Sequence, residues 1–98
     1  MSLFIQLTEQ ARAALEALQS DAGLSKRLKA VRKTLARLES NPRHPGLQSH
    51  KFQSLRGPGG RDVFEAYAEQ ATPAAYRVFW FYGPDKSVIT VIAITSHP

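Results

Sequence analysis

The fold of this chain is decided by residues 75–95, AYRVFWFYGPDKSVITVIAIT. The segments Ala75–Tyr82 and Ser87–Thr95 are rich in β-branched and aromatic residues, which is typical of strands. Between them, the sequence GPDK contains residues that favour a turn. The pattern therefore predicts a β-hairpin, in which Arg77 stands among aromatic residues and the second strand runs out toward His97.

The aromatic residues of the first hairpin strand allow two interpretations. Aromatic side chains next to basic residues suit stacking on nucleobases. In a domain this small, however, alternating aromatic positions more commonly build the core. We expect most of them to be core residues, with Trp80 and Tyr82 partly exposed; the set is Tyr76, Phe79, Trp80, Phe81 and Tyr82.

The composition bounds the class of protein. A chain of 98 residues predicts a single domain, residues 1–98, with one core. Its 13 Lys and Arg against 8 Asp and Glu give a net charge of +5, which favours an anionic partner such as nucleic acid, the ribosome or an acidic protein. The absence of cysteine excludes disulfides and thiolate chemistry. Without a long apolar run or a signal-peptide pattern, the chain is predicted to be cytoplasmic and not membrane-bound.

Two helices are predicted before the hairpin. An alanine-rich apolar stripe indicates a helix from about Glu9 to Gln19, and Gly23 ends it. A second helix, from about Ser25 to Glu39, presents leucine and valine residues on one face. The opening residues 3–7 (LFIQL) fit a strand and a helix nearly equally well, so periodicity leaves them undecided.

The second helix also carries a basic row on a different face, which either is simply solvated or contacts nucleic acid. This row consists of Lys26, Lys29, Lys33 and Arg37.

The middle of the chain is predicted to contain one loop and one strand. Residues 41–45 (NPRHP) stop the second helix, because each proline lacks an amide donor and disfavours helical geometry before it. The basic, glycine-rich segment Gly46–Asp62 is predicted to be a loop. In residues Val63–Glu69, small or apolar residues alternate with Glu65, Tyr67 and Glu69, which predicts a strand with one solvent-facing side.

Two kinds of site, a metal centre and a serine nucleophile, have no support in the sequence. The three histidines have no metal-ligand spacing, and no serine stands in a nucleophile motif. An acid–base site is more plausible, because Glu65, Tyr67, Arg77 and His97 fall on consecutive strands of one sheet. Arginine binds phosphate oxygens and histidine exchanges protons near neutral pH, as RNA transesterification requires. Alternatively, Arg77 stacks on an aromatic residue or pairs with Glu65, and His97 is merely solvated.

The order of several short segments resembles the RelE/ParE superfamily of bacterial toxin–antitoxin toxins. These segments are residues 38–47 (LESNPRHPGL), 50–52 (HKF), 55–57 (LRG), 76–80 (YRVFW) and 94–97 (ITSH), and the likeness spans essentially the whole chain. The resemblance implies an α+β fold: an N-terminal strand and two antiparallel helices packed on a small antiparallel sheet. It thereby favours a strand for residues 3–7.

The resemblance implies two activities: ribosome-dependent cleavage of mRNA, as by RelE-like members, and inhibition of DNA gyrase, as by ParE-like members. We expect a RelE-like mRNA endonuclease without metal or other cofactor, partnered by a cognate antitoxin; a noncatalytic relative that binds a protein is a further alternative. Arg77 matches the arginine that acts at the scissile phosphate. His97 is the expected proton donor and Glu65 the expected base. Glu65 and Tyr67 stand at the positions where some members carry paired lysines. Basic residues that would dock RNA are Lys51, Arg56 and Arg61.

Overall fold

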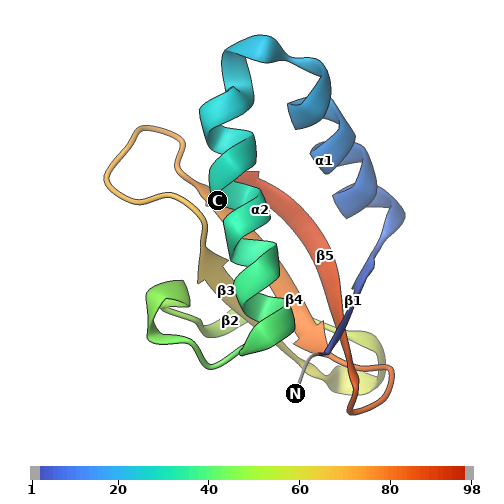
Figure 1. The fold of residues 1–98 in the computed structure, drawn as a ribbon. Coiled ribbons are helices and arrows are strands. Elements are labelled where there is room, and N and C mark those ends of the chain that lie inside the picture. The colour runs from blue at the N-terminus through green and yellow to red at the C-terminus, as the bar shows by residue number, and fades with distance from the viewer. Residues whose placement is uncertain (1–2, 97–98) are drawn as a thin grey trace.

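The computed structural model describes residues 3–96 as an α+β fold, in which two helices lie against one five-stranded sheet (Figure 1). The helices are α1 (Glu9–Ser20) and α2 (Ser25–Ser40). The strands are β1 (Phe4–Leu7), β2 (His50–Arg56), β3 (Asp62–Tyr67), β4 (Tyr76–Tyr82) and β5 (Val88–Ser96).

The predicted hairpin forms the centre of the sheet, whose strand order is β1-β5-β4-β3-β2. β4 and β5 pair antiparallel from Tyr76 opposite Ser96 to Tyr82 opposite Ile89. Residues 3–7 are confirmed as extended: β1 occupies Phe4–Leu7 and pairs with β5 in parallel. The sheet is therefore mixed, with an antiparallel part made of β2 to β5.

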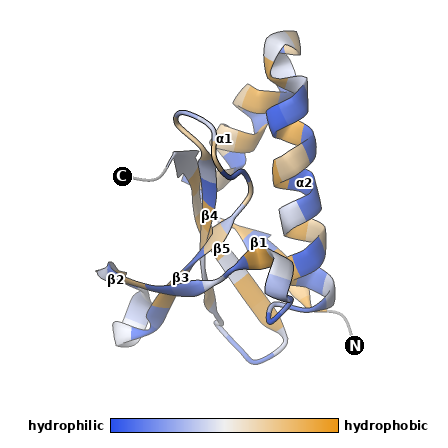
Figure 2. Ribbon diagram, turned by 90° about the vertical axis from the view of Figure 1, so that its left-hand side faces the viewer, coloured by the Kyte–Doolittle hydropathy of each residue, from blue (hydrophilic) through white to orange (hydrophobic). Residues whose placement is uncertain are grey.

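Both helices cover the same face of the sheet, as Figure 2 shows from the side. Their apolar stripes pack on alternate residues of β4 and β5, and the predicted inward face of α2 is confirmed. The expectation that Trp80 is partly exposed is wrong: it is 1% exposed, because it points into this core, whereas Tyr82 at the strand end is 39% exposed. Buried members of the core include Leu18, Val31, Leu38, Val78, Trp80 and Val91.

The prediction of a loop over Gly46–Asp62 is wrong in its central part, because β2 lies there and pairs antiparallel with β3. β2 is an edge strand, and only Phe52 among its seven residues is even partly buried. Its register is also interrupted between Lys51 and Arg56. The strand is held by backbone pairing to β3 rather than by an apolar pattern, so its sequence carries no strong strand signal.

Within residues 3–96, no helix covers the second face of the sheet, where Val63, Phe79 and Ala93 form a small apolar cluster. This open face carries the polar residues described next. Among residues 3–96, no helix is long and apolar enough to cross a membrane.

Candidate active site

Four polar or aromatic side chains from three neighbouring strands meet on the open face. Strand pairing places His50 of β2 opposite Glu65 of β3, and Tyr67 of β3 opposite Arg77 of β4. Alternation along each strand turns all four to the same side of the sheet. The structure therefore brings together three of the predicted residues and adds His50, whereas His97 lies outside the described residues.

Glu65 is the buried centre of this group. Its side chain is fully buried, which contradicts the prediction that it lies on a wet face. The Oε1 atom lies 2.9 Å from His50 Nε2, and the Oε2 atom lies 3.8 Å from Arg77 Nε. A buried carboxylate is tolerated where cationic or hydrogen-bonding partners surround it. Because solvent and substrate do not reach Glu65, its influence on a reaction passes through His50 and Arg77.

His50 is the accessible member of the pair. Its side chain is 49% exposed, and its ring meets that of Tyr67 edge-on at 5.9 Å between centroids. Nε2 faces Glu65, and Nδ1 lies 3.3 Å from the carbonyl oxygen of Gln48. The imidazole ring therefore lies next to the buried carboxylate on one edge and is open to solvent elsewhere.

His50 is a functional candidate that its sequence context did not reveal, because it lies in the segment Gly46–Asp62, for which a loop was predicted. A strand at residues 50–56 would have placed it beside Glu65, and the resemblance does include the segment HKF. A histidine is a residue type suited to proton transfer, but the sequence pattern did not indicate that His50 lies on a strand beside Glu65.

Arg77 is held in one orientation by contacts on several sides. Its Cζ atom stands 3.9 Å above the Tyr67 ring centroid, close enough for a cation–π interaction. Nη1 donates to the carbonyl oxygens of Glu69, at 2.8 Å, and Tyr76, at 3.3 Å. Nη2 makes no hydrogen bond to any residue in the described range 3–96. The guanidinium is therefore fixed and keeps donors for an anion.

A second layer fixes the segment that holds Arg77. Arg27 of α2 forms a 2.8 Å ion pair with Glu69, and the backbone N–H of Tyr76 donates to the same carboxylate at 3.0 Å. Arg27 also lies 4.4 Å from the centroid of the Tyr76 ring. Because Glu69 supplies the carbonyl that Arg77 binds, α2 helps to position the site.

The three predicted RNA-docking residues are already engaged. Lys51 and Arg56 pair with Asp62, at 3.4 and 2.7 Å. Arg61 donates to the carbonyl oxygens of Tyr82 and Pro84, and so ties β3 to the β4–β5 turn. Lys51 and Arg56 are exposed and stay candidates for RNA contact; Arg61 has a structural role as well.

The basic row of α2, by contrast, makes no ion pair with any described residue and borders the site. With Tyr67, Gly46 and Gln70, it lines a shallow hollow of about 310 Å³. The row consists of Lys26, Lys29, Lys33 and Arg37. Residues 3–96 contain no group of His, Asp and Glu that could hold a metal ion.

The sequence matches no protein-family model and no curated protein. Solved structures share the fold over nearly the whole chain. The YoeB/ParE toxin from Agrobacterium tumefaciens has a TM-score of 0.72 at 10% identity, over 98% of this chain and 100% of that chain. A chain of the archaeal RelE–RelB complex from Pyrococcus horikoshii has a TM-score of 0.66 at 21% identity, over 98% and 96%. A chain of the E. coli RelBE toxin–antitoxin complex has a TM-score of 0.59 at 18% identity, over 99% of each.

Proposed function

We propose that this chain, which has the fold of RelE/ParE toxins, is the toxin of a toxin–antitoxin pair and cleaves messenger RNA at the ribosome without a metal ion. The observation that carries the proposal is the buried Glu65 carboxylate between His50 and Arg77. An accessible histidine, a fixed arginine and a shielded carboxylate on one sheet face are what acid–base cleavage of a phosphodiester needs.

In this mechanism, the ribose 2′-hydroxyl attacks the adjacent phosphorus while the bond from phosphorus to the 5′-oxygen breaks. Nδ1 of His50 takes the proton of the 2′-hydroxyl in place of its 3.3 Å contact with the Gln48 carbonyl, and Glu65, next to Nε2, stabilises the imidazolium that forms, as a buried carboxylate does in a catalytic triad. Arg77 binds the phosphate oxygens as their negative charge grows. His97 is proposed to protonate the leaving 5′-oxygen.

The distribution of positive charge supports an RNA substrate. The net charge is +5, and the unpaired basic row of α2 lines a hollow that also includes Tyr67 of the site. Cations in this position would attract and bind the phosphate backbone on either side of the scissile bond. Lys51 and Arg56 would add to this field from β2.

The proposed protein partner is a cognate antitoxin. Two of the solved structures that share this fold are a RelE–RelB complex and a RelBE toxin–antitoxin complex, which supports the proposal. Co-expression with the protein encoded by an adjacent acidic reading frame should yield a stable complex and restore growth.

Induction in a bacterial host tests the activity. Wild type should arrest growth, and primer extension should reveal new mRNA ends within translated codons. Arg77→Ala and His50→Ala should abolish both effects, whereas Lys86→Ala, in the exposed β4–β5 turn, should behave as wild type. Growth arrest with intact mRNA would contradict the proposal. Arrest together with blocked supercoiling by purified gyrase would favour ParE-like inhibition instead.

A further inference from the structure

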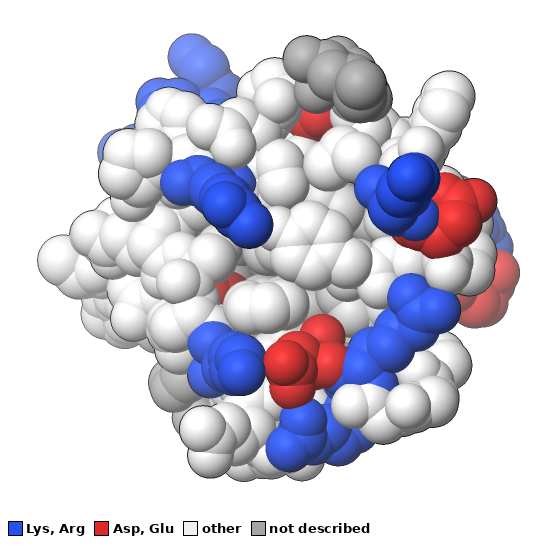
Figure 3. All heavy atoms as spheres, turned by 90° about the horizontal axis from the view of Figure 1, so that it is seen from below, with Lys and Arg blue, Asp and Glu red and all other residues white. Residues whose placement is uncertain are grey.

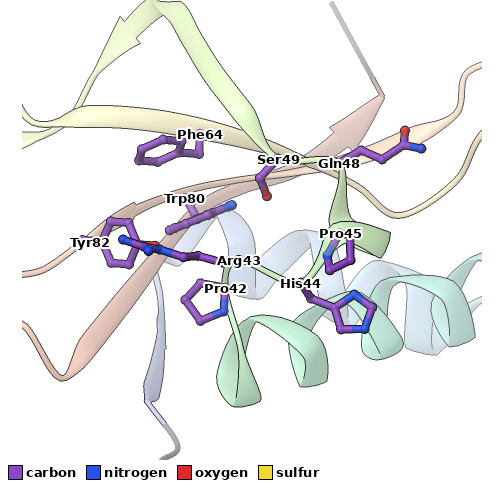
Figure 4. A pocket seen from close by; sticks show the side chains of 9 residues that line it. All are labelled: Pro42, Arg43, His44, Pro45, Gln48, Ser49, Phe64, Trp80 and Tyr82. Atoms are coloured by element: carbon purple, nitrogen blue, oxygen red, sulfur yellow. The ribbon is translucent and has the colours of Figure 1, made fainter.

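A hollow of about 440 Å³ lies on the helix side of the sheet, where α2 and β4 end, apart from the candidate active site (Figure 4). Aromatic residues of β3 and β4 form one wall, and the segment between α2 and β2 forms the other. His44 Nδ1 accepts a 2.8 Å hydrogen bond from the Gly46 N–H, which fixes this second wall. The residues used below are Arg43, Ser49, Phe64, Trp80 and Tyr82.

The wall contains a buried donor that has no partner. Trp80 is 1% exposed, and its indole N–H makes no hydrogen bond to any residue of the described chain. Its nitrogen is on the edge of the ring that is turned toward Ser49 and the hollow (Figure 4). Nearly all buried polar groups in folded proteins have a partner, so one that lacks it indicates a missing acceptor. An acceptor in the hollow would complete this N–H.

The rest of the wall is suited to a planar ligand. Phe64 stacks on Trp80 at 4.8 Å between ring centroids, and Tyr82 meets Trp80 edge-on at 4.9 Å. Tyr82 is 39% exposed and is fixed by both neighbours, so it offers a rigid aromatic surface. Such surfaces stack on bases of single-stranded nucleic acid.

Positive charge accompanies this aromatic wall. The end of the molecule at which α2 and β4 finish bears both basic and acidic side chains around an uncharged centre (Figure 3). Arg43 at the mouth of the hollow is exposed and makes no ion pair with a described residue. A phosphate attached to the planar ligand would find its partner here.

We propose that this hollow binds one nucleobase of the single-stranded RNA, with Tyr82 stacking on the base, Trp80 donating to a carbonyl or ring nitrogen, and Arg43 binding a flanking phosphate. Ser49, which is exposed, lines the hollow beside Trp80. The inference rests on the proposed RNA substrate and deepens it.

The position of the hollow relative to the active site supports one continuous RNA path. Ser49 lines the hollow and is followed directly by His50 of the site. Consecutive residues of an extended segment point to opposite sides of a sheet, and β2 is its edge. An RNA strand that crosses this edge would present a phosphate to His50 and a nearby base to the hollow.

Trp80 makes the test direct, because it is the only tryptophan of the chain. The full chain is titrated with each nucleoside 5′-monophosphate, and tryptophan fluorescence is excited at the red edge, where nucleotides absorb little. We expect saturable quenching by at least one nucleotide and none by ribose 5-phosphate, which lacks the base. Tyr82→Phe should keep this binding, whereas Tyr82→Ala should weaken it roughly tenfold, the loss of one stacking contact. Arg43→Ala should also weaken it without disturbing the core.

The measurement does not depend on RNA cleavage, because none of the residues that line the hollow belongs to the candidate active site. Lys86→Ala, in the exposed β4–β5 turn, should leave nucleotide binding unchanged. Cleavage of mRNA without nucleotide quenching would overturn this inference and leave the proposed function standing. Quenching without cleavage would overturn the proposed mRNA cleavage and leave nucleobase binding in the hollow standing. Equal binding by Tyr82→Ala and wild type would also overturn it. Quenching by an acidic antitoxin peptide but by no nucleotide would assign the hollow to a protein partner and contradict the proposal.

Discussion

Glu65 couples the two side chains that would handle the proton and the phosphate. Its Oε1 atom lies 2.9 Å from His50 Nε2 and its Oε2 atom lies 3.8 Å from Arg77 Nε. Removal of its charge therefore affects both functional groups, although Glu65 itself does not reach the substrate.

Glu65→Gln should lower the cleavage rate roughly 100-fold or more, because an amide stabilises an imidazolium far less well than a carboxylate. The shape of the side chain is kept, so the far-UV circular dichroism spectrum should stay that of wild type. Single-turnover cleavage of mRNA on purified ribosomes measures the effect. A folded Glu65→Gln protein with the wild-type rate would exclude Glu65 from the mechanism.

Arg77→Lys should lose nearly as much activity as Arg77→Ala, on the order of 10²-fold or more. A lysine ammonium cannot stack as a planar group on Tyr67 while donating to the carbonyl of Glu69. Tyr67→Phe, which preserves the ring face, should keep most of the activity, and Tyr67→Ala should not. Single-turnover cleavage of mRNA on purified ribosomes measures these differences. An active Arg77→Lys variant would show that only the charge at this position matters.

The helix α2 supports the site through one largely buried ion pair. Arg27 reaches from this helix to Glu69, which is the residue whose carbonyl orients Arg77. These contacts link α2, the segment after β3 and strand β4, which are far apart in the sequence.

Arg27→Ala should destabilise the fold by about 1–3 kcal/mol, since it leaves the largely buried Glu69 carboxylate without its cation. Urea denaturation measures this difference, and cleavage should fall together with stability under native conditions. The matched control is Arg32→Ala on the exposed side of the same helix, for which we expect a change within about 0.5 kcal/mol. Equal midpoints for the two variants would contradict this role of Arg27.

The turn between β4 and β5 depends on Gly83 and Arg61. Gly83 has φ of +131°, and a Cβ atom there would lie 1.8 Å from Arg61 Nη1. Gly83→Ala should therefore cost about 1–3 kcal/mol or more from backbone strain and the clash. In an Arg61→Ala background the clash is gone, and the additional cost of Gly83→Ala should shrink. Strictly additive effects in thermal denaturation would argue against the clash.

For the molecule as a whole, the sequence predicted the elements whose stability comes from apolar patterning. The stripes of α1 and α2 and the β-branched run of β5 reflect burial against one core, so their periodicity reveals them. β2 lacked such a pattern because backbone pairing at the sheet edge holds it. For β1, periodicity allowed either a strand or a helix, and the sequence resemblance favoured the strand.

The difference between strands with an apolar pattern and β2, which is held by backbone pairing, also explains which site residues could be predicted. The placement of Arg77, Glu65 and Tyr67 on one sheet face could be predicted because they lie on strands with a recognisable alternating pattern. His50 was missed together with β2, and the burial of Glu65 was missed because it depends on neighbouring strands rather than on its own. Contacts between distant segments, such as Arg27 with Glu69, leave no local signal in the sequence.

Cleavage of a defined mRNA on purified ribosomes in the presence of a chelator tests the central claim most directly. Wild type should produce a discrete 5′ fragment that ends in a 2′,3′-cyclic phosphate, and Arg77→Ala and His50→Ala should produce none. Intact mRNA with the folded wild-type protein, or equal cleavage by wild type and both variants, would contradict the account.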